Sequence, residues 1–236
     1  MDKEELLLRY ECEGGEDLYA EAKPKFEEAL AASPGDARLL NAYGYLLECH
    51  GRRMIRAAAG CYQQAIDADP DWAKPRFQQI GALSALRDAH EVIARYEARL
   101  AESPGDPLAY ELLALAYLYD HDHPAAARAI AAGLERFPGH PGLIEQQGDL
   151  YAATGRPDDA LAWWRRAADA APDGYGISMH YSAAFLLERL GRLAEAAGEW
   201  RFIIGWCEAH DAVIEAQWPG QELQRIQAAL DARRAT

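Results

Sequence analysis

The sequence lacks long hydrophobic runs, although half of its 236 residues are hydrophobic. A transmembrane helix needs about 20 consecutive apolar residues, and no segment approaches that length. Near the start, Leu6, Leu7 and Leu8 form an apolar run of only three residues between charged ones. That run is too short for the core of a secretory signal peptide. We therefore expect a cytoplasmic protein that does not interact with membranes.

Cysteine is also scarce, and the sequence contains no C-x-x-C pair. The four cysteines, Cys12, Cys49, Cys61 and Cys207, are scattered along the chain. A chain of this length can bury a sufficient core without disulfides, so unpaired cysteines fit a reducing compartment. A Gly-rich phosphate loop, a metal-ligand spacing and a catalytic triad are likewise missing from the pattern. We predict no catalytic residues, no metal and no cofactor.

Basic residues are too few to balance the acidic ones. Lys and Arg number 24 against 38 Asp and Glu, which gives a formal net charge of −14. This charge repels a phosphate backbone, so nucleic acid is not an expected ligand. Half of the excess lies in residues 1–36, with eleven acids and four bases. A basic partner would therefore be attracted first to this part of the chain.

Prolines recur along the chain at nearly constant spacing. Pro34, Pro70, Pro104, Pro138 and Pro172 are separated by 36, 34, 34 and 34 residues. Each follows a segment with apolar residues three and four apart, as in an amphipathic helix. A period of this length is typical of helical repeat proteins.

A second break inside each repeat predicts two helices per repeat. The segment Ser-Pro-Gly-Asp at 33–36 recurs at 103–106, where Asp36 and Asp106 can cap the following helices. Pro124 and Pro157 fit the first turn of the second helix in their repeats. The predicted fold class is therefore all-α.

The positions of large and small residues within these repeats resemble the tetratricopeptide repeat family. In residues 141–174 the matching positions are Ile144, Gln147, Gly148, Tyr151, Gly155, Ala160, Trp164, Ala167 and Pro172. In residues 37–72 they are Leu40, Tyr43, Gly44, Leu47, Ala58, Tyr62, Ala65 and Pro70. The resemblance implies one right-handed α-solenoid over residues 1–236. Its six hairpins would lie at about 3–36, 37–72, 73–106, 107–140, 141–174 and 175–210, followed by a capping helix at about 219–233.

The resemblance also implies a concave surface lined by the first helix of each hairpin. Helical spacing places an acidic and aromatic set of residues there: Asn41, Tyr45, Glu48, Gln78, Glu111, Leu115, Tyr119, Glu145, Asp149, Tyr181, Phe185 and Glu188. Such a surface suits a protein or peptide that carries basic residues and apolar anchors. The expected function is a non-catalytic adaptor or scaffold. The Lys, Arg and Asn clamp with which some relatives bind acidic chaperone tails is missing.

Two other functions remain open at this stage. The first is a small-molecule sensor or enzyme on the same scaffold. His121-Asp122-His123 offers weak support for it, because this segment fits a solvated turn. The pair Cys207 and His210 also offers only weak support. The second is a structural homo-oligomer that uses Trp163, Trp206 and Trp218 as an apolar patch. Frequent Ala and Arg in the second helices favour a bacterial source.

Overall fold

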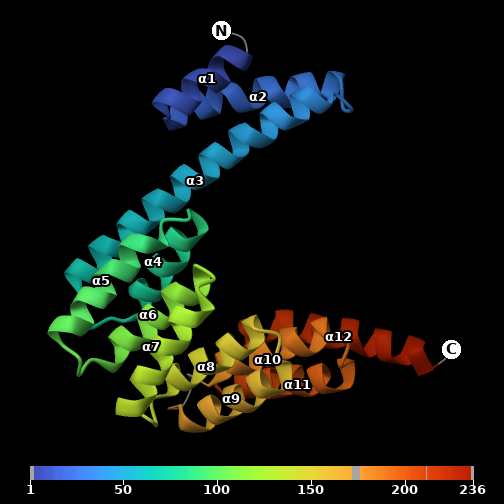
Figure 1. Cartoon of the computed structure of the whole chain (residues 1–236). Helices are drawn as coiled ribbons and strands as arrows, with labels where there is room; N and C mark the ends of the chain where they lie inside the picture. The colour runs from blue at the N-terminus through green and yellow to red at the C-terminus, as the bar shows by residue number, and fades with distance from the viewer. Residues whose placement is uncertain (1–2, 172–175, 211, 235–236) are drawn as a thin grey trace. The chain divides into compact units, whose positions relative to one another are not determined.

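The computed structural model describes residues 3–171, 176–210 and 212–234, and every regular element within these ranges is a helix (Figure 1). The chain is divided into two compact units, Met1–Asp88 and Ala89–Thr236. A single solenoid over the whole chain therefore stays a prediction. Pro172, the last of the periodic prolines, lies outside the described residues. Over the described ranges, none of the helices has both the length and the apolarity needed to cross a membrane.

In the first unit, one long helix lies in the chain between two shorter helices before it and one after it. They are α1 (Lys3–Glu13), α2 (Glu16–Ala32), α3 (Ala37–Ala68) and α4 (Lys74–Ala85). Leu6 and Tyr10 of α1, Phe26 of α2, and Leu39 and Leu46 of α3 form a buried cluster. The remainder of α3 packs against α4. In this unit α3 therefore contacts all three other helices.

The predicted hairpin at 37–72 is wrong, because α3 is one continuous helix of 32 residues. No proline lies between Ala37 and Ala68, so every backbone N–H in the middle of the segment can join the helical hydrogen-bond ladder. Gly51, near the middle of the segment, is helical rather than left-handed. A glycine permits a turn but does not force one.

The second unit is made of consecutive antiparallel helices. They are α5 (Ala89–Glu102), α6 (Pro107–Tyr119), α7 (His123–Arg136), α8 (Pro141–Ala153), α9 (Pro157–Ala170), α10 (Ile177–Arg189), α11 (Leu193–Ala209) and α12 (Val213–Arg234). Extensive contacts join α6 to α7, α8 to α9, α10 to α11 and α11 to α12. The capping helix begins at Val213 rather than near 219, so Pro219 lies inside it. Packing against α11 holds α12 together despite the missing N–H of the proline.

Local sequence signals set the ends of these helices. The Asp36 carboxylate accepts hydrogen bonds from the backbone N–H of Arg38 and Leu39 at 2.9 and 3.1 Å. Asp106 does the same at the start of α6, so both predicted caps are confirmed. Gly155 and Gly191 have φ of 76° and 71° at the turns inside their helix pairs. A glycine adopts this left-handed conformation without steric cost.

Small residues let the paired helices approach closely. A Cβ atom added to Gly148 of α8 would lie 2.5 Å from Cδ1 of Trp164 on α9. Trp164 is 5% exposed and belongs to the same buried cluster as Ile144, Ala160 and Trp200. The repeat therefore depends on a tryptophan that packs where its neighbour has no side chain.

We predict that Gly148→Ala destabilises the second unit by roughly 1–3 kcal/mol, because the added methyl group would overlap the indole ring. Gly198 of α11 is the matched control, since a Cβ atom there meets nothing within 4 Å. Gly198→Ala is expected to stabilise the protein by about 0.5–1 kcal/mol through helix propensity. Urea unfolding of both variants measures the difference. Equal free energies of unfolding would contradict this account.

Candidate partner-binding surface

The candidates in the first unit are on its surface. Asn41, Tyr45 and Glu48 of α3 and Gln78 of α4 are all exposed. The Tyr45 hydroxyl donates a hydrogen bond to the Glu11 carboxylate at 2.8 Å, and this bond is the main cause that raises the pKa of Tyr45 to about 12. The structure thus leaves these polar side chains accessible to solvent.

Three of the carboxylates predicted for the groove of the second unit are engaged within the protein. Glu111 is 3% exposed, with Oε2 3.7 Å from Nδ1 of His140. Asp149 accepts a hydrogen bond from Nε1 of Trp164 at 2.9 Å. Glu188 of α10 accepts one from Nε1 of Trp200 at 2.7 Å. The expectation that these three residues project freely from the stack is therefore corrected.

Asp149 and Glu188 accept hydrogen bonds from equivalent tryptophans of successive helix pairs, but they differ in their positions on the first helix and in their surroundings. Burial raises the pKa of Asp149 to about 6, and the hydrogen bond from Trp164 acts in the opposite direction with a smaller effect. Glu188 also forms an ion pair with Arg225 of α12. The indole N–H groups need buried acceptors, and these carboxylates provide them.

The aromatic candidates of α10 lie together with a residue that the sequence interpretation placed elsewhere. The ring of Trp218, from α12, stacks on Tyr181 with centroids 5.9 Å apart and lies 5.8 Å from Phe185. Phe185 and Trp218 are 49% and 45% exposed, and both also contact the buried Trp200 edge-on. We call Tyr181, Phe185 and Trp218 the α10–α12 aromatic surface.

The sequence does contain a signal for the place of Trp218. This residue follows Tyr181 by 37 positions and Phe185 by 33, which is close to one repeat. It therefore occupies a first-helix position one repeat later rather than a separate patch with Trp163 and Trp206. Trp163 instead contacts Tyr151, with ring centroids 6.2 Å apart.

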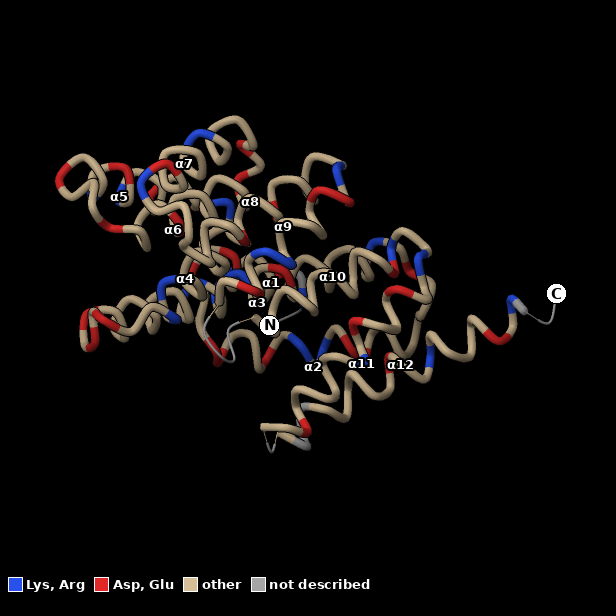
Figure 2. Tube along the Cα trace, turned by 90° about the horizontal axis from the view of Figure 1, so that it is seen from below, with Lys and Arg blue, Asp and Glu red and all other residues tan. Residues whose placement is uncertain are grey.

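The other candidates of the second unit differ in exposure. Tyr119 at the end of α6 is 51% exposed, whereas Leu115 and Glu145 are partly buried. Charged residues of both signs are distributed along many helices (Figure 2). The aromatic residues therefore form the better-defined part of the predicted surface.

The weaker chemical candidates have structural roles. The Asp122 side chain caps α7 by accepting a hydrogen bond from Ala125 N–H at 2.9 Å. Cys207 is 2% exposed in the core, and the exposed His210 ring stacks on Trp206 with centroids 4.1 Å apart. Among the residues described, no group of three or more His, Cys, Asp or Glu side chains could hold a metal ion.

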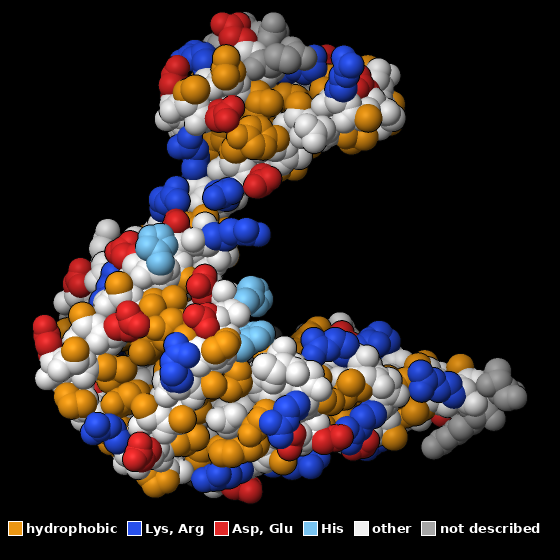
Figure 3. Space-filling view, in the orientation of Figure 1, with side chains coloured by type: hydrophobic (Ala, Val, Ile, Leu, Met, Phe, Trp, Pro, Cys, Tyr) orange, Lys and Arg blue, Asp and Glu red, His pale blue; other side chains and the backbone are white. Residues whose placement is uncertain are grey.

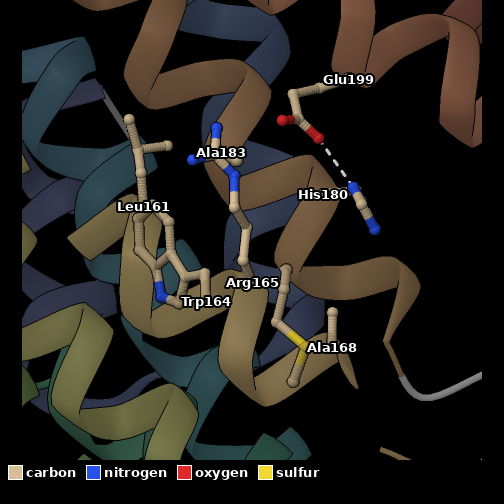
Figure 4. Close-up of a pocket in the computed structure, with 8 residues that line it drawn as sticks. Leu161, Trp164, Arg165, Ala168, His180, Ala183 and Glu199 are labelled. Carbon is tan, nitrogen blue, oxygen red and sulfur yellow. Dashed lines mark hydrogen bonds and ion pairs between the residues drawn. The ribbon is translucent and has the colours of Figure 1, made fainter. Parts of the chain in front are cut away.

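A small pocket lies between α9, α10 and α11 (Figure 4). Its walls include Leu161, Trp164, Met179 and Ala183, and Nδ1 of His180 lies 2.7 Å from a carboxylate oxygen of Glu199 at its edge. The enclosed space is about 10 Å³, which is roughly what one water molecule needs. This pocket does not have room for an organic ligand.

A larger recess in the first unit, of about 360 Å³, is lined by residues that include Tyr10, Glu16, His50 and Arg53. The Arg53 guanidinium already donates hydrogen bonds to the backbone carbonyl oxygens of Tyr10 and Glu11 at 3.1 and 3.2 Å. The Tyr10 hydroxyl lies 2.9 Å from Nδ1 of His50. The Tyr10, His50 and Arg53 side chains of this recess are therefore already hydrogen-bonded within the protein.

Stacked pairs of antiparallel helices, with exposed aromatic residues on their first helices, define a helical repeat scaffold. The family model for the tetratricopeptide repeat matches residues 15–73 and 111–175, which together make up just over half of the chain. The protein therefore belongs to the tetratricopeptide repeat family. The repeat fold fits a protein-interaction scaffold.

Solved structures show the same fold. A thermophilic tetratricopeptide repeat protein of Thermus thermophilus is 18% identical, with a TM-score of 0.52 over 78% of this chain and 94% of its own. A chain from the APC/C hetero-tetramer Cut9–Hcn1 is 12% identical, with a TM-score of 0.52 over 96% of this chain and 49% of its own. A comparison with curated protein sequences gives no match.

We predict that Asp149→Asn stabilises the protein at pH 7. The raised pKa means that the folded state binds a proton more tightly than the unfolded state, so the stability of the wild type falls as the pH rises from about 4 to about 6. Asn keeps an acceptor for Trp164 without the buried charge. The expected gain at pH 7 is about 1–2 kcal/mol, allowing for partial exposure, and it vanishes near pH 4.

Thermal unfolding at several pH values measures this effect. Glu188→Gln is the matched control, because it also keeps an acceptor for a tryptophan but loses the ion pair with Arg225. It is expected to give no gain in stability at pH 7. If Asp149→Asn followed the same pH dependence as the wild type, the buried carboxylate would not be the group that titrates.

Proposed function

We propose that this protein is a non-catalytic adaptor that holds a peptide or helix of a partner protein on the first-helix side of its repeats. The α10–α12 aromatic surface is the main anchoring site. The single observation that carries the proposal is the exposure of Phe185 and Trp218, each nearly half accessible to solvent, on top of the buried Trp200.

This arrangement favours binding for a physical reason. The rings of Tyr181, Phe185 and Trp218 support one another and rest on a buried ring, so little rotamer entropy remains to be lost when a partner docks. Aromatic residues held in this way are typical of the residues that contribute most to protein–protein affinity. Tyr119 and Leu115 extend the same kind of surface on α6 of this unit.

The partner is expected to combine apolar anchors with Lys or Arg. The formal net charge of −14 attracts a basic partner over a distance. Glu111, Asp149 and Glu188 are engaged with protein groups, so they contribute less direct pairing than the sequence suggested. Apolar contact therefore supplies most of the affinity, and charge mainly raises the association rate.

An adaptor also fits the family, which is generally non-catalytic. A small-molecule sensor has less support, because the pocket between α9, α10 and α11 has room for only about one water molecule. In the recess beside Tyr10, the side chains of Tyr10, His50 and Arg53 are already hydrogen-bonded within the protein. One relative by fold, from the Cut9–Hcn1 assembly, is part of a hetero-tetramer.

A peptide library displayed on phage tests the proposal without knowledge of the partner. Peptides enriched on the wild-type protein are expected to contain an aromatic or large aliphatic residue together with Lys or Arg. Their affinity for the Phe185→Ser, Trp218→Ser double variant, measured by calorimetry, is expected to fall by at least about 30-fold. Higher salt should weaken binding to a smaller extent.

Phe202→Ser is the matched control. Phe202 is 51% exposed on α11 and stacks on His180, so it is an accessible aromatic residue on a second helix. The variant is expected to bind the selected peptides as tightly as the wild type. Peptides that bind the double variant unchanged, or that lose affinity only with Phe202→Ser, would show that the binding surface lies elsewhere.

A further inference from the structure

The long helix α3 has an apolar stripe that lies open to solvent. Larger residues recur every seven positions at Leu40, Leu47, Met54 and Cys61, and small residues recur in the same way at Gly44, Gly51, Ala58 and Ala65. The two series alternate at spacings of four and three, which places all eight residues on one face of the helix. Leu40, Leu47 and Met54 are 48%, 40% and 48% exposed, and Cys61 is exposed as well. In Figure 3, hydrophobic side chains are visible at the surface of the part formed by α1, α2 and the first half of α3.

The same repeat positions are buried elsewhere in the chain. Tyr110 and Ile144, which correspond to Leu40, are 7% and 1% exposed. Gly148, which corresponds to Gly44, lies against Trp164, whereas a Cβ atom at Gly44 would meet nothing within 4 Å. The stripe on α3 therefore consists of residues that pack between the two helices of a hairpin elsewhere in the chain. In the described part of the chain, no second helix covers them.

No turn forms at Gly51, and this explains why no second helix covers the stripe. Left-handed residues occur at the turns that join α6 to α7, α8 to α9 and α10 to α11, at His121, Gly155 and Gly191. Arg87 is also left-handed, and Gly51 lies 36 positions before it. The dipeptide Gly-Arg at 51–52 recurs at 155–156 and 191–192. The sequence thus carries a turn signal at Gly51, yet α3 continues through it. The residues that would face each other between the two helices of a hairpin therefore lie along one continuous helix.

We propose that α3 pairs in antiparallel orientation with α3 of a second copy of this chain, about a twofold axis near Gly51. In this arrangement residues 37–50 of each copy cover residues 52–65 of the other, as the two helices of a hairpin would. Leu47 of one copy then lies near Met54 of its partner, and Gly44 lies against the helical turn that contains Ala58 and Tyr62, as Gly148 lies against Trp164 within its own hairpin. Glycine and alanine every seven residues allow the helices to approach to about 8 Å, and a self-complementary seam of this kind closes as a dimer.

Sedimentation equilibrium of the full chain tests the proposal, with the wild type expected to be a dimer. Leu47→Glu places a charge in the seam at a residue that is already exposed in the single chain, so it is expected to weaken dimerisation at least about 100-fold without loss of helicity. Leu8→Glu is the matched control, because Leu8 of α1 is 61% exposed and lies outside the stripe. It is expected to remain dimeric. A monomeric wild type, or a dimer that both variants leave intact, overturns the proposal.

Substitutions near Gly51 distinguish two kinds of dimer. In the first, α3 of each copy supplies the hairpin helix that the other copy lacks; in the second, two exposed surfaces only touch. Gly51→Ala favours a continuous helix over a left-handed turn, so it is expected to tighten the dimer by roughly tenfold. Arg53→Pro recreates the Gly-Arg-Pro sequence found at 155–157 and is expected to give a folded monomer with a closed hairpin. Its helicity by circular dichroism shows whether it folds. A folded Arg53→Pro variant that stays dimeric overturns the antiparallel pairing of α3.

Discussion

The packing of a large second-helix residue against a small first-helix residue is the contact on which the repeats of this protein depend. Trp164 occupies the space that Gly148 leaves open, and Trp200 is fully buried one repeat later, where the corresponding first-helix residue is Ala184. Each such contact fixes the distance between two helices and so determines which residues lie on the outer faces. The exposure of the α10–α12 aromatic surface and the raised pKa of Asp149 both follow from this packing.

A buried tryptophan requires an acceptor for its indole N–H, and this requirement changes the candidate site. Asp149 and Glu188 accept these hydrogen bonds at 2.9 and 2.7 Å. Two residues that suggested an acidic groove therefore bond to tryptophans within the helix pairs instead. The candidates of the second unit that remain exposed are aromatic, and Phe185 and Trp218 are accessible because they rest on the outer side of Trp200 rather than beneath it.

In α3 the conformation of one residue, Gly51, changes which residues of a repeat are exposed. Closing at Gly51 would bury Leu40, Gly44 and Leu47 within the chain, whereas the continuous helix exposes them. Both states satisfy the backbone hydrogen bonds, because a glycine supports a helix as well as a left-handed turn. Whether the closed hairpin or the continuous helix forms therefore depends on whether the apolar stripe is covered within the chain or by another molecule.

The sequence by itself determined the repeat period, the all-α class, the family, the caps at Asp36 and Asp106, and the start of a helix at Pro157. All of these depend on residues within one or two turns of each other or on a fixed spacing of prolines. Only the tertiary structure decided that α3 runs through Gly51, that Asp149 and Glu188 face tryptophans, and that Trp218 joins Tyr181 and Phe185. Helical spacing gives the direction of a side chain around its own axis, but burial and hydrogen bonding depend on which residues of the neighbouring helices meet it.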